Sequence, residues 1–436
     1  MIAPLSRRVF SLAGSAFAAL SASGCSTLAA RGASGSLVED PAGLIDLPRG
    51  FTYRIISTLG EAMDDGEAVP DRADGMGAFR GDGGRVILVR NHELRAAASR
   101  LSGDGFDRWK GGGTLPGGTT TLVFDPASGR TVAQFRSLAG TIRNCGGGVT
   151  PWRSWLTCEE DVSNKGASLG KDHGWVFEVP ADLRGRARPV PLKALGRFNH
   201  EAAAVDPRTG IVYLTEDRED GLFYRFVPAR PGRLIEGGRL QALALADGPG
   251  DSRNWRGVTL PVRRGASARW IGLSETDSPG DDLRLRGAAA GATLFARGEG
   301  IHMGRGELYF TATSGGAARL GQVMRYRPSP LEGRPDEARR PGTLDLFFES
   351  TSRDQFHYGD NLTVGPNGHL FVCEDQPGIT VDNHIRGIRP DGTAYAFARL
   401  RMQTELAGAC FSPDGRILFV NAYSPTRTIA ISGPFI

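Results

Sequence analysis

Cysteine is scarce in this chain, which has 5 cysteines in 436 residues. One of them, Cys25, lies near the N-terminus, and the others are Cys145, Cys158, Cys373 and Cys410. An exported domain held together by disulfides would normally carry more, so the hydrophobic core has to supply the stability. No CxxC pair is present, which argues against a structural zinc site.

A strong charge of one sign is also missing. The formal net charge is +4, and no run of lysine and arginine alternates with aromatic residues in the way that would follow a phosphate backbone. Nucleic acid is therefore not an expected partner. What the chain does have is 61 glycines, 26 prolines and 40% hydrophobic residues. This composition predicts a turn-rich, all-β protein with a large core.

No hydrophobic run is long enough to be a stable transmembrane segment. The N-terminal stretch "SRRVFSLAGSAFAALSASGC" resembles a twin-arginine export signal, with Arg7 and Arg8 ahead of a short, Ala-rich apolar run. We assign residues 1–30 to this signal and expect the twin-arginine machinery to deliver a folded protein to the periplasm or the medium. Release after about Cys25 is favoured over lipid attachment at Cys25, because Ala22 stands where a lipoprotein box would have leucine.

A short hydrophobic block recurs six times along the chain, each time after turn residues such as "GDGG", "DPRTG" or "SPDG". The copies are "VILVRNHE" (86–93), "SWLTCEED" (154–161), "VYLTEDRE" (212–219), "LYFTATSG" (308–315), "LFVCEDQ" (370–376) and "LFVNAYS" (418–424). A second short run precedes each turn, so the unit is strand, turn, strand. Residues 31–436 are therefore predicted to form one six-bladed β-propeller with a long insertion around 220–298. The alternative is a large β-sandwich.

In each predicted hairpin the outer ends of both strands lie at the same edge, and a radial arrangement brings these edges to one central mouth. The polar residues expected there at strand starts are Cys145, Glu201, Glu299 and Asn361. Those expected at strand ends are Asn91, Glu93, Glu159, Glu160, Glu216, Asp217, Glu374 and Asp375. Carboxylates gathered in one funnel repel one another, so bound cations have to compensate.

The ligand types limit which cations fit. Oxygen ligands suit Ca²⁺, Mg²⁺ or Mn²⁺, whereas a thiolate at Cys145 favours a transition metal such as iron. Any single strand-end carboxylate could instead be a solvated rim charge, and His200 could be a ligand or could orient Glu201. Cys158, Cys373 and Cys410 are predicted to be buried packing residues.

Four long motifs resemble the PhoX-type alkaline phosphatases: "TIRNCGGGVTPWRSWLTCEED", "GRFNHEAAAVDPRTGIVYLTEDREDGLFYRF", "GDNLTVGPNGHLFVCED" and "ELAGACFSPDGRILFVNAYSPTRTIAISGPF". The resemblance runs from about Leu47 to the C-terminus. It implies an exported six-bladed propeller whose calcium (Ca²⁺) and iron (Fe³⁺) ions hydrolyse phosphate esters, with Cys145, Glu201 and Glu299 as iron ligands. This chain is shorter than the family's well-known phosphatases, and their substrate-binding lysine and arginine have no clear counterpart here.

The function expected from the sequence is metal-assisted hydrolysis of a small phosphoester, with no serine or histidine nucleophile required. Arg143, beside Cys145, and Arg386, shortly after "CEDQ", are the candidates for steering the anionic substrate. Two alternatives remain open: a propeller lactonase or esterase, and a non-catalytic propeller with structural calcium. Assays on p-nitrophenyl phosphate, lactones and carboxyl esters would distinguish the three.

Overall fold

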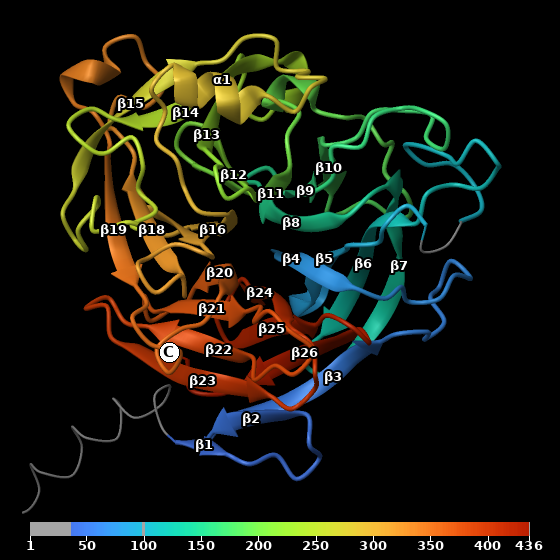
Figure 1. The fold of residues 1–436 in the computed structure, drawn as a ribbon. Helices are drawn as coiled ribbons and strands as arrows, with labels where there is room; N and C mark the ends of the chain where they lie inside the picture. The colour runs from blue at the N-terminus through green and yellow to red at the C-terminus, as the bar shows by residue number, and fades with distance from the viewer. Residues whose placement is uncertain (1–35, 98–100, 436) are drawn as a thin grey trace, which may run out of the picture.

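The structure, a computed structural model, describes residues 36–97 and 101–435, and within them the protein is all-β (Figure 1). The one α-helix within these residues, α1 (Leu283–Ala289), is short, and the 3₁₀ turns found there span Asp82–Gly84, Lys193–Leu195, Leu234–Glu236 and Glu337–Arg339. The predicted export signal, including Arg7, Arg8 and Cys25, lies outside the described residues. Among the described residues, no helix has the length and apolar character needed to cross a membrane.

The strands form antiparallel meanders that pair into five sheets. One sheet has the order β4 (Ala73–Arg80), β5 (Val86–His92), β6 (Gly117–Asp125), β7 (Arg130–Thr141). The next is β8 (Asn144–Val149), β9 (Ser154–Glu159), β10 (Val176–Pro180). A third contains β11 (His200–Val205), β12 (Val212–Glu216), β13 (Phe223–Pro228), β14 (Gly238–Leu245), β15 (Ala266–Gly272), β19 (Thr343–Glu349), β18 (Gln322–Arg327), β17 (Leu308–Ala312), β16 (Gly298–Met303). The fourth is β20 (Gly359–Val364), β21 (Leu370–Glu374), β22 (His384–Ile388), β23 (Ala394–Leu400), β2 (Ile45–Pro48), β1 (Leu37–Val38), and the fifth is β24 (Leu406–Phe411), β25 (Ile417–Ala422), β26 (Arg427–Ser432), β3 (Thr52–Thr58).

The arrangement is propeller-like, which confirms the coarser part of the prediction. Strands β4, β8, β11, β16, β20 and β24 pack against one another in a closed ring around a central axis (Figure 1). Strand β3, near the N-terminus, pairs with the C-terminal β26, so both ends of the chain complete one sheet. Two of the meanders share a nine-stranded sheet because β15 pairs with β14 on one side and with β19 on the other.

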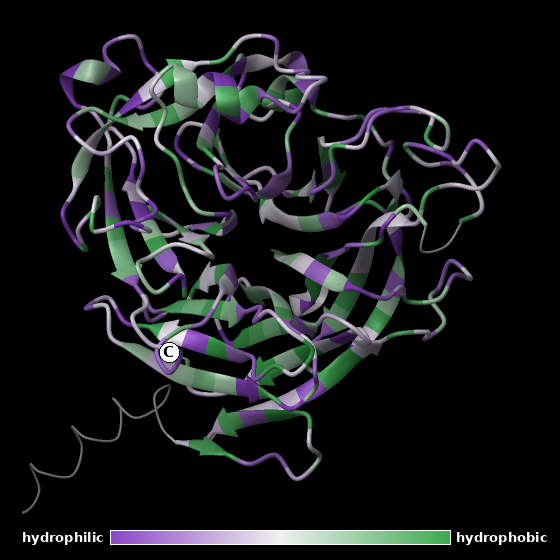
Figure 2. Ribbon diagram, viewed as in Figure 1, coloured by the Kyte–Doolittle hydropathy of each residue, from purple (hydrophilic) through white to green (hydrophobic). Residues whose placement is uncertain are grey.

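The core lies mainly between neighbouring sheets. Figure 2 shows hydrophobic residues along the strands and hydrophilic residues in many of the connecting loops. Fully buried residues such as Leu156, Phe198 and Tyr224 belong to one cluster that joins the β8–β10 sheet to the β11–β14 strands. Burial of large apolar side chains stabilises each by about 1.5–3 kcal/mol, so these clusters hold the ring closed.

The cysteine predictions are largely confirmed. Cys158 and Cys373 are fully buried in β9 and β21. Cys410 packs against a core cluster as expected, but it is only half-buried and also lines a central cavity. The region 220–298, predicted as an insertion, carries β13, β14, β15 and α1.

Candidate metal centre

Each strand of the inner ring carries a β-bulge close to its first residue. The pairing slips between Ala73 and Met76 in β4, Asn144 and Gly147 in β8, His200 and Ala203 in β11, Gly298 and Ile301 in β16, Gly359 and Leu362 in β20, and Ala407 and Cys410 in β24. A bulge leaves residues unpaired and redirects their side chains. In five of these strands the first unpaired residue is of a metal-ligating type: Asp74, Cys145, Glu201, Glu299 and Asp360.

These side chains converge on the axis. The Cys145 Sγ lies 3.4 Å from Asp74 Oδ2 and 3.3 Å from Glu201 Oε1. Ligand atoms of Cys145, Glu160 and Glu201 all lie within 4.8 Å of one another, and so do those of Glu201, Glu299 and Asp360. Glu201 belongs to both groups. We call the converging set, with the residues of the next paragraph, the axial cluster.

A second layer comes from residues that directly follow the second strand of a meander: Glu93, Glu160, Asp217 and Asp375. Arg143 links two of them, since its Nε lies 2.6 Å from Glu93 and its Nη2 lies 2.5 Å from Glu160. Arg297 lies 2.7 Å from both Asp217 and Glu299. Glu160, Asp217 and Asp375 each directly follow a glutamate, so each forms an acidic pair with it. Because side chains alternate along a strand, the glutamate of each pair faces the other way.

The first residues of those pairs lie outside the cluster, contrary to the sequence-based expectation. Glu159 accepts hydrogen bonds from the backbone of Ile142, Gly174 and Trp175 and lies 2.7 Å from His173 Nδ1. Protein donors therefore occupy this carboxylate.

Glu216 and Glu374 also lie outside the cluster. Glu216 Oε2 accepts a 2.7 Å hydrogen bond from the Tyr224 hydroxyl, while its Oε1 is buried without a hydrogen-bond partner among the described residues. Glu374 accepts one of 2.7 Å from Arg386 Nε, which takes Arg386 away from the mouth as well and corrects its predicted steering role.

The two predicted asparagine ligands are also engaged by the protein. Asn91 Nδ2 donates to the carbonyls of Cys145 (2.7 Å) and Gly146 (2.6 Å), while its Oδ1 accepts from Trp155 Nε1. Asn361 Oδ1 accepts from the Gly408 amide, and its Nδ2 donates to Asp360 Oδ1. Asn91 therefore clamps the bulge of the neighbouring strand instead of presenting a free oxygen.

Four residues of this region were not predicted from the sequence: Asp74, Asp360, Arg297 and Glu405. Asp375 was predicted only as one of the polar residues at strand ends. Two signals were available. Asp74 stands before a glycine at the start of its strand, as Cys145 does, and Asp360 directly precedes the predicted Asn361. Glu405 precedes the sixth inner strand, and it interacts with Asp375 through a side-chain hydrogen bond.

The axial cluster is electrostatically unbalanced. It holds nine carboxylates and one thiol, namely Asp74, Glu93, Glu160, Glu201, Asp217, Glu299, Asp360, Asp375, Glu405 and Cys145, and ion pairs bring only Arg143 and Arg297 to it. Burial, then neighbouring negative charges, raise the pKa of Glu201 and of the Cys145 thiol, and raise the pKa of Asp360 to about 7. Buried like charges of this kind are relieved by protonation or by bound cations.

Two oxygens of the cluster lack any partner among the described residues. Glu201 Oε2 and Asp74 Oδ1 are both buried and accept no hydrogen bond. A buried unpaired carboxylate oxygen is costly, because it loses its water without gaining a donor. Their position among other ligand-type atoms fits a bound cation.

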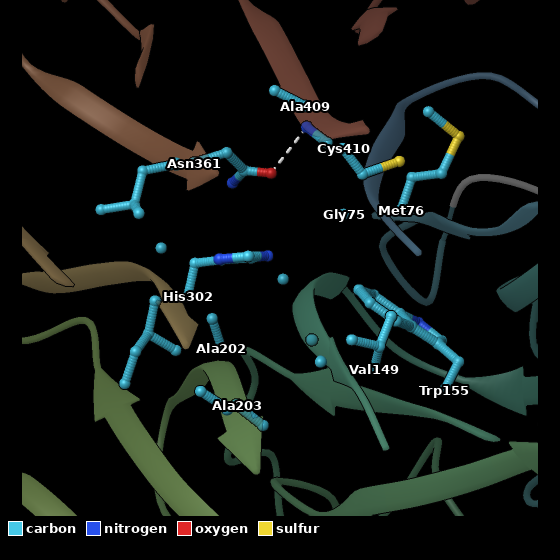
Figure 3. Close-up of a pocket in the computed structure, with 18 of the residues that line it drawn as sticks. Gly75, Met76, Val149, Trp155, Ala202, Ala203, His302, Asn361, Ala409 and Cys410 are labelled. Atoms are coloured by element: carbon cyan, nitrogen blue, oxygen red, sulfur yellow. Dashed lines mark hydrogen bonds between the residues drawn. The ribbon is translucent and has the colours of Figure 1, made fainter. Parts of the chain in front are cut away.

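Small residues allow this close approach. A Cβ on Gly146 would lie 2.7 Å from the Glu201 carbonyl oxygen, and one on Gly75 would lie 2.7 Å from the Cys145 carbonyl oxygen. Only glycine fits where adjacent inner strands come so near. Beneath the cluster, these glycines line an axial cavity of about 170 Å³ into which Asn361 and His302 point (Figure 3).

The family model described as "Alkaline phosphatase PhoX" matches residues 33–426. None of the curated proteins matches the sequence.

Among solved structures, PhoX from Pseudomonas fluorescens in complex with vanadate, a transition state analogue, is similar with a TM-score of 0.67 and 18% identity, covering 93% of this chain and 98% of that chain. A protein of unknown function from Dyadobacter fermentans gives a TM-score of 0.46 and 8% identity, covering 87% and 99%. A gluconolactonase from Xanthomonas campestris gives 0.38 and 15%, covering 87% and 100%. At these identities the likeness concerns the fold.

Proposed function

Because the chain belongs to the alkaline phosphatase PhoX family, and is thereby a phosphoester hydrolase, we propose that it cleaves small phosphate esters at the axial cluster. The observation that carries the choice of site is the pair of buried, partnerless oxygens on Glu201 and Asp74 within a ring of further carboxylates. Such a ring is unfavourable on its own and becomes favourable when cations occupy it.

We assign two kinds of cation to the cluster. The group Cys145, Glu160 and Glu201 includes a thiol, and a thiolate ligand favours a transition metal, here iron. The group Glu201, Glu299 and Asp360 offers only oxygens, which suits calcium. The donor set thus supports the calcium and iron expected from the sequence, with Glu201 shared between them.

Cations bound in the cluster would supply Lewis acidity, neutralising charge on phosphoryl oxygens and lowering the pKa of coordinated water. The protein supplies the positioning. Arg297, held between Asp217 and Glu299 with its side chain 31% exposed, presents a guanidinium at the mouth next to a proposed ligand. Arg143 occupies the corresponding place between Glu93 and Glu160, with 24% of its side chain exposed. Fixed guanidinium groups pair well with phosphate oxygens.

Two finer statements belong to the same proposal. We treat the molecule as a single six-bladed propeller, because six bulged strands form the inner ring and the nine-stranded sheet divides at β15 into two meanders. We also propose export by the twin-arginine route to the periplasm or the medium, supported by the paired Arg7 and Arg8 ahead of a short apolar run. A folded export substrate would carry its metals from the cytoplasm.

Metal analysis of protein exported by its native route, combined with turnover of p-nitrophenyl phosphate, tests this function. We expect iron together with calcium, phosphatase activity that a chelator removes, and no turnover of lactones or carboxyl esters. Turnover of lactones or carboxyl esters without phosphatase activity would favour a lactonase or esterase. Bound calcium without iron and without any turnover would mean a binding protein.

A further inference from the structure

A ring of six side chains surrounds the mouth of the axial cluster, and one of them, Glu405, is itself a carboxylate of that cluster. Five of them lie two residues before the ligand-type residue of their inner strand, and they are Arg72, Arg143, Asn199, Arg297 and Tyr358. The sixth is Glu405, which directly precedes β24. Four of these have a left-handed backbone, with φ of 55° at Arg72, 44° at Arg143, 56° at Arg297 and 57° at Tyr358. Long side chains in this conformation are uncommon and carry a cost of about 1–3 kcal/mol each. Such repeated strain at one place in the fold indicates a functional site.

The three arginines of this ring are not equivalent. Arg143 and Arg297 each bridge two carboxylates, so the protein already occupies all three guanidinium nitrogens of Arg143 and two of Arg297. Arg72 forms no ion pair with a carboxylate of the described residues. Its Nη1 donates a 3.0 Å hydrogen bond to the Tyr423 hydroxyl, and its guanidinium carbon lies 5.6 Å from the centre of that ring.

The nearby acidic groups Asp71 and Glu93 make their hydrogen bonds to other partners. The adjacent Asp71 accepts hydrogen bonds from the Ser424 hydroxyl (2.7 Å) and the Thr426 amide (2.9 Å). Tyr423 donates its own hydroxyl to Glu93. Arg72 is therefore tethered at one nitrogen to a neutral group, close to the axial cluster, while most of its donor fork remains available.

We propose that Arg72 is a substrate-binding residue that recognises the phosphoryl oxygens of the ester, and this rests on the proposed phosphatase function. A guanidinium binds a tetrahedral oxyanion through two parallel hydrogen bonds, and it does so best when no internal carboxylate competes. The Tyr423 hydroxyl aims the guanidinium, and no carboxylate of the described residues forms an ion pair with it, although Glu93 and Asp71 lie near enough to favour its charge. Arg143 and Arg297 face the mouth but are also held by the carboxylates of the axial cluster, whereas Arg72 forms no such ion pair within the described residues and adds a further cation for the incoming anion.

The test compares Arg72→Lys and Arg72→Ala with wild type, using p-nitrophenyl phosphate as substrate and inorganic phosphate as competitive inhibitor. We expect Arg72→Ala to raise both the KM and the phosphate inhibition constant about 10- to 100-fold, the range for losing hydrogen bonds to a charged group. Arg72→Lys, which keeps the charge but loses the fork, should fall between. Iron and calcium content should stay at the wild-type level in both variants.

The control is Arg416→Ala. The Arg416 side chain is 77% exposed in the turn between β24 and β25, at the opposite end of this hairpin from Leu406, where β24 begins near the axis. This variant should match wild type in KM and inhibition constant. Unchanged KM and inhibition constant in both Arg72 variants would overturn the proposal while leaving the phosphatase function intact. Loss of metal from the Arg72 variants would assign the residue to structure and overturn it too. A wild type that turns over no phosphoester would overturn both the function and this inference.

Discussion

The substitution Glu201→Gln should have opposite effects on the metal-free and the metal-loaded protein. It preserves the size of the side chain and removes one negative charge. The ligand atoms around Glu201 lie within 4.8 Å of one another. Two unit charges at that separation repel by about 3 kcal/mol at an effective dielectric constant of about 20. Burial and the neighbouring carboxylates raise the pKa of Glu201, so removing its charge relieves repulsion on this scale in the metal-free protein at a pH high enough to ionise Glu201.

With cations bound, the sign reverses. The Glu201 carboxylate belongs to both candidate ion sites, so the glutamine weakens two sites at once. We expect the chelator-treated variant to melt above chelator-treated wild type by on the order of 5 °C, given a few degrees per kcal/mol for large domains. The variant purified with its metals should melt below loaded wild type, should contain less iron and calcium, and should lose phosphatase activity.

The assay is differential scanning calorimetry with and without chelator, together with elemental analysis of the same samples. Glu159→Gln is the matched control, since Glu159 is an equally buried carboxylate whose oxygens accept protein hydrogen bonds. It should destabilise the protein to a similar degree in both states. The reasoning fails if Glu201→Gln keeps full metal content and full turnover, or if it melts below wild type after chelation.

Three further predictions concern the surroundings of the cluster. Asp360→Asn should lose metal, whereas Asn361→Ala should retain it, because the Asn361 amide oxygen already accepts a hydrogen bond from the Gly408 amide. Elemental analysis of both variants tests this. Metal loss in Asn361→Ala but not in Asp360→Asn would place the ligand at Asn361. Asn91→Ala should lower metal affinity about 10- to 100-fold, as expected when a group that orients a ligand is removed, and chelator titration showing wild-type affinity would contradict the clamp on Cys145. Burial opposes the charge on His173, but Glu159 and Asp107 outweigh it and raise its pKa to about 9. Its stabilisation is thus complete below the unfolded pKa of about 6.5 and is lost as the pH rises through about 9. The melting temperature of His173→Gln should therefore approach that of wild type between pH 7 and 10, and a difference that stays constant with pH would refute the coupling.

The sequence was sufficient to predict the hairpin blocks and the shared edge at which their polar ends meet. It placed Cys145, Glu201 and Glu299 at one repeat position, and the structure brings all three to the axis. The repeated turn residues and β-branched runs carry this information locally, because each hairpin is defined by residues close in sequence.

The choice within each acidic pair needed the register of the strand. In "CEED", "TED" and "CED" both carboxylates look equivalent, yet Glu159 faces His173 while Glu160 faces the axis. Alternation along the strand separates them, but which one turns inward depends on the pairing partner. Asp360 was missed for a related reason, since the bulge in β20 redirects it and a bulge leaves little trace in sequence.

The acidic pairs therefore divide two tasks between adjacent residues. Outward members such as Glu159 and Glu374 accept hydrogen bonds from several protein donors, among them the Gly174 and His357 amides and Arg386 Nε, and these bonds do not depend on bound ions. Inward members such as Glu160 lie among the ligand-type atoms on the axis, beside Glu201, which keeps an oxygen without any protein donor among the described residues. Since the hydrophobic clusters between sheets contain none of the carboxylates of the axial cluster, the ring can close before cations arrive. Removing the cations should then abolish activity at a chelator concentration that still leaves the sheets folded.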